Sequence, residues 1–234
     1  MPDRTLYTER RSLLLPGTVW RRSAPAGAAR IRPDGCMDLI WDGERLLVAG
    51  PDTATATFTT DRPSELVAVR FDPGIAPLIL GCPAHELVDS RLDIDELPQQ
   101  RPVRALIDAL AAAVEPAAVL ERELAERLRS CGGAPGWIPA SVRLLGAGKP
   151  IALIADRLGV TPRHLGRKSL QQFGYGPKTL QRILRMNRAV EMLRHHAELS
   201  AVAHACGYSD YSHMFRDFRH ITGDPPSAFQ PSGA

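Results

Sequence analysis

The sequence has 234 residues, enough for one large domain or two modest ones, and its 29 Lys and Arg against 26 Asp and Glu give a formal net charge of +3. It has no run of about 18 uncharged apolar residues and no basic-then-apolar start, so we expect neither a membrane-spanning helix nor a secretory signal. Four cysteines lie far apart without Cys-x-x-Cys spacing, which favours reduced thiols in a cytoplasmic protein over a disulfide framework.

The N-terminal part of the chain has the composition of short strands joined by turns. Asp42-Gly43-Glu44, between two apolar segments, predicts the turn of a β-hairpin. The apolar segment 66–71 is followed directly by Asp72-Pro73-Gly74, a turn-forming combination that ends a strand. The expected elements are strands at 37–41, 45–49 and 66–71 and a short helix at 77–80. We therefore predict a β-rich domain over residues 1–100.

Two helices are expected next, over about 102–114 and 116–131. In the second of them Leu120, Leu124 and Leu128 recur every four residues and form one apolar stripe. Such a stripe is most often core or interdomain packing, and a dimer seam is the alternative. Gly132-Gly133-Ala134-Pro135-Gly136 follows as a linker, so residues 101–136 form a predicted helical connector.

The charge is unevenly divided between the two parts of the chain. Residues 137–234 contain 13 Lys and Arg against 6 Asp and Glu, a surplus of +7, whereas residues 1–136 contain 16 against 20, or −4. Six of the seven histidines also lie in the basic part. This asymmetry favours a polyanionic partner for residues 137–234. Ordinary surface charge could give the same pattern, so the interpretation needs a motif beside it.

An internal duplication supplies that motif. At an offset of 48 residues, Ala155, Gly159 and Thr161 match Ala203, Gly207 and Ser209. At an offset of 49, the matches are Leu165 with Met214, Arg167 with Arg216, Gly174 with Gly223 and Pro177 with Pro226. One inserted residue in the second turn explains the change of offset.

Each copy has the parts of a helix-turn-helix unit. In the first, a helix at 151–158 carries a small residue, Ala155, where two helices cross, and Gly159 can take the positive φ of a tight turn. Thr161 is the expected N-cap of a second helix, with Pro162 at its first position. Ala203, Gly207 and the cap Ser209 take the same parts in the second copy, where Cys206 is expected to be a small core residue. We predict an all-α domain over 137–234 with helix-turn-helix units at 151–173 and 200–220.

Residues 177–196 predict one helix between the two copies. Twenty residues span roughly 30 Å, close to the distance of about 34 Å between successive major-groove faces of DNA. A rigid spacer of this length would present two recognition helices to the same side of a duplex. Arg182, Arg185, Arg188 and Arg194 give the spacer either a functional positive surface or an ordinary solvated face.

Residues 150–230 resemble the DNA-binding domain of the AraC/XylS family of transcription regulators. The resemblance is carried by Ala205-Cys206-Gly207-Tyr208-Ser209-Asp210-Tyr211-Ser212-His213-Met214-Phe215-Arg216 and by the first-copy segments 159–165 and 174–177. Ser169 departs from the family pattern, which has a core aromatic there, and Leu170 or Phe173 is expected to fill the space. Residues 12–95 resemble uncharacterised β-rich, cupin-like domains found ahead of such units, which implies a sensor or dimerisation role.

The resemblance also implies which residues touch DNA. In the first recognition helix Arg163 and Arg167 would read bases, because an arginine fork can donate to two acceptors of guanine, while His164 and Lys168 would lie nearer the phosphates. Gly166, at a family contact position, has no side chain. In the second helix the contact positions are Tyr211, Ser212, His213 and Arg216, although His213 could instead cap or pack.

The implied fold is α+β with two domains: a β-rich, cupin-like sensor domain, a helical connector and an all-α DNA-binding domain. The implied partner is double-stranded promoter or operator DNA, read by recognition helices in successive major grooves. A small-molecule effector bound by the N-terminal domain, RNA polymerase and a second copy of the chain are further expected partners, whereas a membrane and a cofactor are not. The family resemblance implies a cytoplasmic protein and transcription activation, although the residues themselves do not fix the sign of regulation.

Two alternatives are weaker. An enzyme in the N-terminal part lacks support, because a metal-dependent cupin needs several histidines and His85 is the only one before His164. Cys36, Cys82 and His85 could bind zinc only if folding gathers them, Asp34 and Asp38 suit a turn and a strand surface, and no Gly-x-Ser-x-Gly or phosphate-binding loop occurs. We expect no catalytic or metal site. A DNA-organising protein would bind without sequence preference, but two full recognition units favour a regulator.

Overall fold

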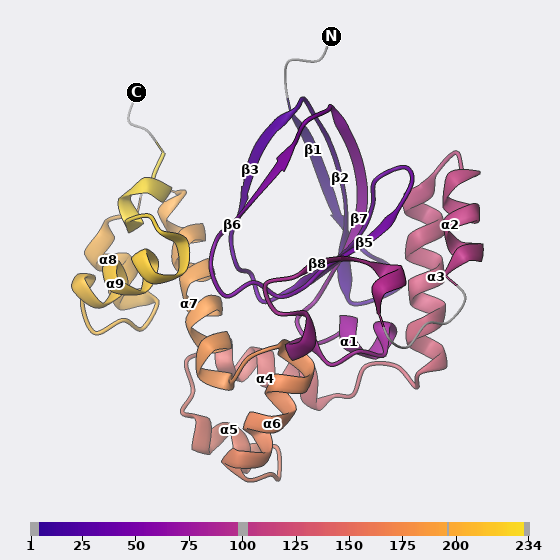
Figure 1. Ribbon diagram of the computed structural model, residues 1–234. Helices are drawn as coiled ribbons and strands as arrows, with labels where there is room; N and C mark the ends of the chain where they lie inside the picture. Colours follow the sequence, from indigo (N-terminus) through magenta and orange to yellow (C-terminus); the bar gives the residue numbers. More distant parts are fainter. Residues whose placement is uncertain (1–4, 98–102, 196, 232–234) are drawn as a thin grey trace.

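The computed structural model describes residues 5–97, 103–195 and 197–231. A β-rich N-terminal part is followed by helices, of which the first lie beside the sheet and the later ones lie below and to its left in Figure 1. The last helices form two helix-turn-helix units. The predicted α+β fold, with a β-rich domain, a helical connector and an all-α C-terminal part, is therefore confirmed.

The main sheet is antiparallel, and its strands are ordered β1-β2-β7-β4-β5-β8. Their bounds are β1 Leu6–Arg11, β2 Gly17–Ala24, β4 Met37–Trp41, β5 Leu46–Ala49, β7 Ser64–Phe71 and β8 Arg91–Asp93. The predicted hairpin is β4 and β5. The Asp42 carboxylate accepts hydrogen bonds from the backbone N–H groups of Glu44 (3.0 Å) and Arg45 (2.7 Å), while Gly43 takes φ +99°. A local turn thus fixes this register.

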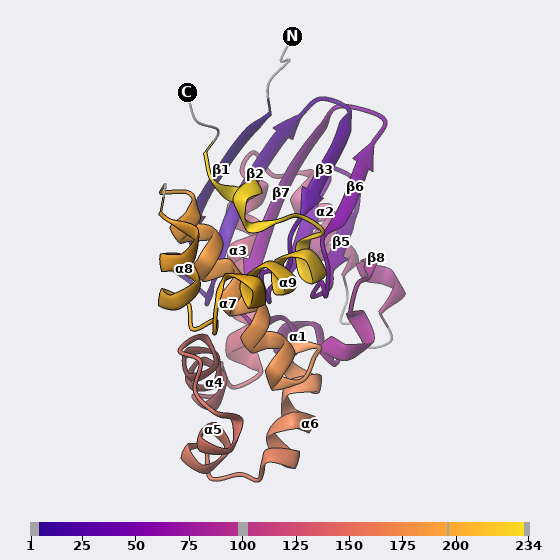
Figure 2. The same ribbon diagram turned by 90° about the vertical axis from the view of Figure 1, so that its left-hand side faces the viewer.

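Two further strands form a separate ribbon that the sequence did not predict. β3 (Gly27–Ile31) pairs antiparallel with β6 (Ala56–Thr60), and we call this pair the β3–β6 ribbon. Because β2 leads into β3 and β6 leads into β7, the ribbon continues the β2–β7 pairing beyond the main sheet (Figure 2). Most of its side chains are exposed. A strand pair without a buried face has no hydrophobic alternation, so the sequence gives little sign of it.

The helical elements between β7 and residue 131 lie beside the sheet, and the last of them packs directly on it. They are α1 (Ala76–Leu80), the 3₁₀ turns η1 (Ala84–Leu87) and η2 (Ile94–Glu96), α2 (Arg104–Ala111) and α3 (Pro116–Ser130). Leu120, Leu124 and Leu128 of α3 are buried, and the helix packs on β2, β7 and α1. The leucine stripe is therefore core packing and not a dimer seam. Pro102, where the first of these helices was expected to begin, lies outside the described residues.

The C-terminal part is helical throughout its described length. Its elements are α4 (Trp137–Gly146), α5 (Ile151–Arg157), α6 (Pro162–Phe173), α7 (Pro177–Leu193), α8 (Leu199–Ala205), α9 (Tyr211–Thr222) and the 3₁₀ turn η3 (Pro226–Phe229). The spacer α7 has 17 residues instead of the expected twenty, and the expected last residue, His196, lies outside the described residues. None of the helices formed by the described residues has both the length and the apolar character needed to cross a bilayer.

The described residues form two hydrophobic cores, and the boundary between these cores lies at the middle of α7. The larger core runs without a break from the main sheet through α3 to α6 and the first half of α7, ending at Ile183. The smaller core begins at Met186 and joins the second half of α7 to α8 and α9. Cys206 is buried in it beside Met192, as expected of a small core residue. The domain limits predicted from the sequence stay a proposal, because the packing is continuous across residue 136.

Candidate nucleic-acid interface

The first unit has the local geometry that its sequence predicts. Gly159 takes φ +64° and ends α5. The Thr161 hydroxyl then accepts a hydrogen bond from the backbone N–H of His164 at 3.2 Å, which caps α6. Ala155 is fully buried at the crossing of the two helices. The exposed N-terminal turn of α6 is thereby set at a fixed angle to α5.

The second unit differs from the prediction at its cap. Asp210, and not Ser209, is the N-cap of α9: its carboxylate accepts from the backbone N–H of His213 at 2.7 Å. This hydrogen bond lowers the pKa of Asp210, as expected for a carboxylate at the positive end of a helix. Ser209 is therefore the inserted residue of the longer turn. The offset of 49 residues therefore already holds at the caps Thr161 and Asp210, where the sequence comparison had paired Thr161 with Ser209.

A different aromatic residue fills the place where the first unit departs from its family. Ser169 is fully buried, and its hydroxyl has no hydrogen-bond partner among the residues that the structure describes. Phe173, which is only 1% exposed, fills the adjoining space and lies edge-on to Trp137 with ring centroids 6.1 Å apart. Leu170 is 45% exposed and does not fill it. Of the two alternatives the sequence left open, Phe173 is correct.

The predicted contact residues of α6 lie at its exposed start. Arg163 and Arg167 are exposed, and Nη2 of Arg167 is 3.0 Å from Nδ1 of His164. The ammonium group of Lys168 instead lies 4.6 Å from the centroid of the Trp137 ring, which is a cation–π contact. Gly166 faces open space. Two guanidinium groups on successive turns are therefore free to reach a ligand.

The predicted contact residues of α9 are arranged similarly. Ser212 and Arg216 are exposed, while Tyr211 is half-buried and packs on Phe215 with centroids 6.1 Å apart. The His213 ring lies edge-on to Tyr208 at 5.2 Å, and its Nδ1 is 3.2 Å from the Ser209 hydroxyl. In this structure His213 thus packs against its own turn, the alternative that the sequence left open.

A buried carboxylate that sequence reasoning missed fixes α9 to α7. Asp217 accepts from Arg182 (Nη2 to Oδ1, 2.9 Å) and from Arg185 (Nη2 to Oδ2, 2.6 Å). Arg185 also lies 4.2 Å from the centroid of the Tyr208 ring. Two of the four spacer arginines therefore hold the second unit in place instead of forming a solvated face. The signal in the sequence was an acidic residue directly before the apolar Phe218 on the buried side of α9.

Another spacer arginine also has a structural partner. Arg188 donates from Nη2 to the backbone carbonyl of Ala205 at 2.6 Å, at the end of α8. Arg194, the last of the four, lies 3.4 Å from Glu191 one turn earlier. Exposed arginines remain on the two recognition helices, which lie toward opposite ends of α7 (Figure 1).

Two carboxylates of the N-terminal part, Asp34 and Asp38, form contacts within the fold. Asp34 and Asp38 lie on either side of the Arg70 guanidinium, 3.4 and 3.5 Å from its Nε. Asp38 also accepts from Nε1 of Trp20 at 2.6 Å, and burial raises its pKa to about 6. Within the described part of the chain no three His, Cys, Asp or Glu residues could hold a metal ion, so Cys36, Cys82 and His85 are not gathered into a site.

Comparison with protein families assigns both parts of the chain. Residues 154–232 match a family described as a helix-turn-helix domain, and residues 18–93 match a domain of unknown function, DUF6597. The fold and the two capped, exposed helices thus define a helix-turn-helix DNA-binding protein. More particularly, the chain carries an AraC-type helix-turn-helix domain behind a DUF6597 domain, which confirms the resemblance to AraC/XylS regulators.

Solved structures of low sequence identity are also similar. A probable AraC family transcriptional regulator from Rhodopseudomonas palustris CGA009 is 23% identical; the match covers 42% of this chain and 100% of that one, with a TM-score of 0.36. ToxT from Vibrio cholerae O395 is 8% identical over 97% of this chain and 96% of its own, with a TM-score of 0.44. No curated protein gives a significant match. Both TM-scores lie below 0.5, so we base the assignment on the two domain matches.

Proposed function

We propose that this protein is a sequence-specific transcription regulator that inserts α6 and α9 into successive major grooves of DNA. The observation that carries the proposal is the pair of capped helices at the two ends of α7, each exposing arginine in its first two turns. Arg163 and Arg167 would read bases from one helix and Arg216 from the other, since arginine donates two hydrogen bonds to guanine.

The dimensions of the spacer support this placement. Seventeen residues give α7 a length of about 25 Å. Both α6 and α9 pack on α7, and packed helices lie about 8–10 Å apart. Offsets of this size on either side of α7 bring the separation of the two helices to at most about 30 Å, near the pitch of about 34 Å that brings one face of a duplex back to the same side. The polar contacts of Asp217 with α7 keep the second recognition helix from rotating freely about the spacer.

The AraC-type domain indicates a regulator rather than an enzyme. Because it must meet promoter DNA, we expect the protein to act in the cytoplasm. The remaining proposals concern its control: a small molecule that changes the DNA affinity through the DUF6597 domain, contact with RNA polymerase, and pairing with a second copy of the chain at the promoter.

Selection of bound fragments from genomic DNA, followed by affinity measurements at fixed salt, tests the function. We expect the selected site to be bound about 10³-fold or more tightly than random duplex. Arg167→Ala and Arg216→Ala should each cost about 1–3 kcal/mol against that site. Arg129→Ala is the matched control, because Arg129 is exposed on α3, across the sheet from α9 (Figure 1).

Three outcomes would count against the proposal. Equal affinity for selected and random duplex would indicate a DNA-organising protein. Unchanged binding by both recognition-helix variants would show that α6 and α9 are wrongly placed on DNA. An equal loss in Arg129→Ala would mean that overall charge, and not base reading, sets the affinity.

A further inference from the structure

An exposed aromatic ring lies on the second turn of α9, directly before Arg216. This residue, Phe215, is 38% exposed, whereas its other neighbour, Met214, is fully buried. Its ring lies one turn after that of Tyr211, with the two centroids 6.1 Å apart. A single apolar side chain on a protein surface is ordinary, so Phe215 is informative only through its position and its packing.

The core of the second unit does not need this ring. Met214 and Phe218 of α9 are buried in that core, and Phe218 lies edge-on to Phe229 with centroids 5.5 Å apart. Tyr211 belongs to the described residues that pack against this core, and Phe215 does not. The Phe215 ring therefore stays in water unless a ligand covers it, and covering its apolar surface contributes favourable free energy.

The internal duplication gives the position of Phe215 a counterpart in the first unit. At the offset of 49 residues that relates the caps Thr161 and Asp210, Phe215 corresponds to Gly166. Among the described residues, nothing beyond the adjoining backbone of α6 lies within 4 Å of a Cβ atom added at Gly166, so this position faces open space. The same position on α9 carries a phenyl ring. The two recognition helices therefore differ in the group that they present there.

An arginine follows this position in both units. Arg167 comes directly after Gly166 and Arg216 directly after Phe215, and both arginines are exposed. An arginine fork suits guanine, whereas an apolar side chain such as phenylalanine suits the C5-methyl group of thymine in the major groove. The second turn of α9 therefore carries a polar and an apolar base reader on adjacent residues, whereas α6 carries only the polar one at these two positions.

We propose that Phe215 contacts the C5-methyl group of a thymine in the major groove and makes the second unit specific for thymine beside the base that Arg216 reads. This inference rests on the function proposed above and adds one base to the sequence that α9 recognises. The two halves of the DNA site should then differ in kind. The half bound by α9 requires a thymine methyl group, and the half bound by α6 has no such requirement at the position of Gly166.

Removal of single methyl groups from the DNA tests the contact without changing the protein. Each thymine of the selected site is replaced in turn by deoxyuridine, which lacks the methyl group and keeps the hydrogen-bonding groups of the base. The affinity of the full chain is measured at fixed salt. We expect one replacement, in the half of the site whose protection depends on Arg216, to weaken binding about fourfold, the effect of one buried methyl group.

Variants of the protein show which residue contacts that methyl group. Phe215→Ala should bind the thymine site about fourfold or more weakly than the parent chain, and it should bind the thymine and deoxyuridine sites equally. Phe215→Leu should keep part of the preference for thymine, because leucine is also apolar. Leu170→Ala is the matched control: Leu170 is an exposed apolar residue of α6, and its loss should leave the preference unchanged.

The outcomes separate this inference from the function on which it rests. Three results overturn it: equal binding of the thymine site and every deoxyuridine site by the parent chain, a full preference for thymine in Phe215→Ala, or selected sites without thymine in the half bound by α9. An equal loss of preference in Leu170→Ala overturns it as well. A chain that prefers its selected DNA but ignores the methyl groups contradicts only the role of Phe215. A chain without any DNA preference contradicts the regulator, and this inference with it.

Discussion

The two helix-turn-helix units share a motif but differ in how they join the rest of the molecule. The first contributes its core residues to the same hydrophobic core as the sheet, whereas the second has a core of its own beyond the middle of α7. A repeated local structure can therefore be either part of a cooperative domain or an attached module. Long-range packing, and not the motif, therefore decides which unit can move separately from the sheet.

Close contacts hold the first unit to the sheet. Gly74 takes φ +85°, and a Cβ atom there would come within 2.6 Å of the Phe173 ring and 2.9 Å of Ile138. Nε2 of Gln172 donates to the carbonyl of Gly74 at 2.6 Å. At the other end of the contact, a Cβ atom on Gly174 would lie 2.6 Å from Pro51. Apolar interlocking of this kind leaves no room for independent motion.

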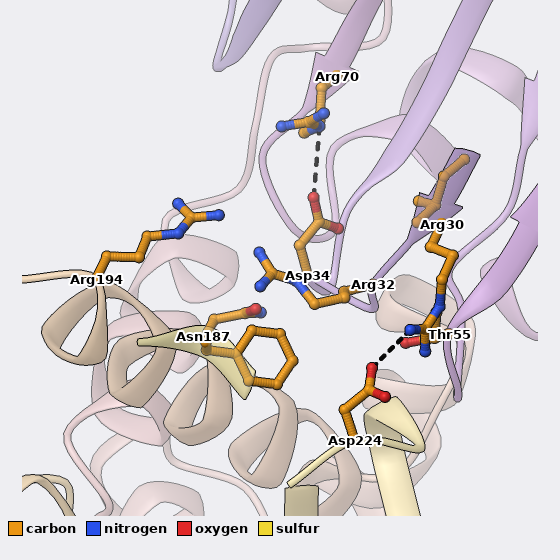
Figure 3. A pocket seen from close by; sticks show the side chains of 10 residues that line it. Arg30, Arg32, Asp34, Thr55, Arg70, Asn187, Arg194 and Asp224 are labelled. Atoms are coloured by element: carbon orange, nitrogen blue, oxygen red, sulfur yellow. Dashed lines mark ion pairs between the residues drawn. The ribbon is translucent and has the colours of Figure 1, made fainter. Parts of the chain in front are cut away.

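In contrast, the contacts recorded among the described residues between the second unit and the ribbon with its flanking residues are hydrogen bonds, an ion pair and a cation–π contact. Besides the ion pair of Arg30 with Asp224 (Figure 3), the backbone N–H of Thr55 donates to the carbonyl of Ile221 at 2.9 Å. Exposed ion pairs and single hydrogen bonds contribute about 0–1.5 kcal/mol each. They lie at the C-terminal end of α9, away from the predicted DNA contacts in its first two turns. The position of the second unit relative to the sheet is therefore the one that should change at the lower free-energy cost.

Removal of the aromatic ring that joins the first unit to the sheet is expected to have the largest effect. Phe173→Ala should destabilise the chain by about 3–5 kcal/mol, because it leaves a cavity between α6 and the sheet. Urea denaturation measures the loss, and hydrogen exchange should show weaker protection in both the sheet and the first unit. Leu170→Ala, on the exposed side of the same helix, is the control and should change stability little. If exchange increases only in α5 and α6, the two regions do not share one cooperative core.

The matching substitution in the second unit should affect that unit alone. Phe218 is fully buried, and Phe218→Ala should cost a similar amount, about 3–5 kcal/mol, within that unit. Here we expect faster hydrogen exchange confined to α8, α9 and the second half of α7, with the sheet as protected as in the parent chain. Loss of protection throughout the chain would contradict the division of the cores.

Loss of the buried Asp217 carboxylate should also destabilise the second unit, but by less than Phe218→Ala does. Asp217→Asn removes the charge that Arg182 and Arg185 share, and we expect a loss of about 1–3 kcal/mol in the stability of the second unit. The first unit should keep its stability. Binding to the selected DNA site should weaken, because α9 is no longer held against α7. DNA binding equal to that of the parent chain would show that Asp217 does not position the helix.

Loss of the ion pair between Arg30 of the ribbon and Asp224 should have the smallest effect on the free energy of unfolding. Arg30→Gln removes an ion pair whose arginine side chain is more than half exposed, so we expect a change of about 0–1 kcal/mol in unfolding. Its effect should be seen in the hydrogen exchange of residues 221–224, which should become faster while the second core is unchanged. A loss as large as that of Phe218→Ala would mean that the ribbon, and not the second core, keeps this unit folded.

The parts of this structure that the sequence predicts correctly are those that depend on a few neighbouring residues. The hairpin at Asp42-Gly43-Glu44, the cap at Thr161 and the turn at Gly159 depend on conformational preferences of one to three residues, and each is found as expected. The cap of the second unit was misplaced by one residue. Ser209 and Asp210 are both good caps, and only the packing of α9 decides between them.

Contacts between distant residues explain what could not be predicted. The β3–β6 ribbon has exposed side chains on both strands and therefore lacks a hydrophobic period. The pairing of Gly74 with Phe173, and of Arg30 with Asp224, joins residues about a hundred or more positions apart, for which a single sequence holds no local sign. The pocket of Figure 3, lined by residues of both parts of the chain, follows from these contacts, so it too became visible only in the folded chain.

Hydroxyl-radical footprinting on a selected DNA site shows whether both recognition helices read DNA. We expect two protected windows on one face of the duplex, about one helical turn apart, because α6 and α9 would occupy successive major grooves. Arg167→Ala should lose protection in one window and Arg216→Ala in the other. A single window, or two windows of which neither variant alters either, would contradict the reading of DNA by both helices.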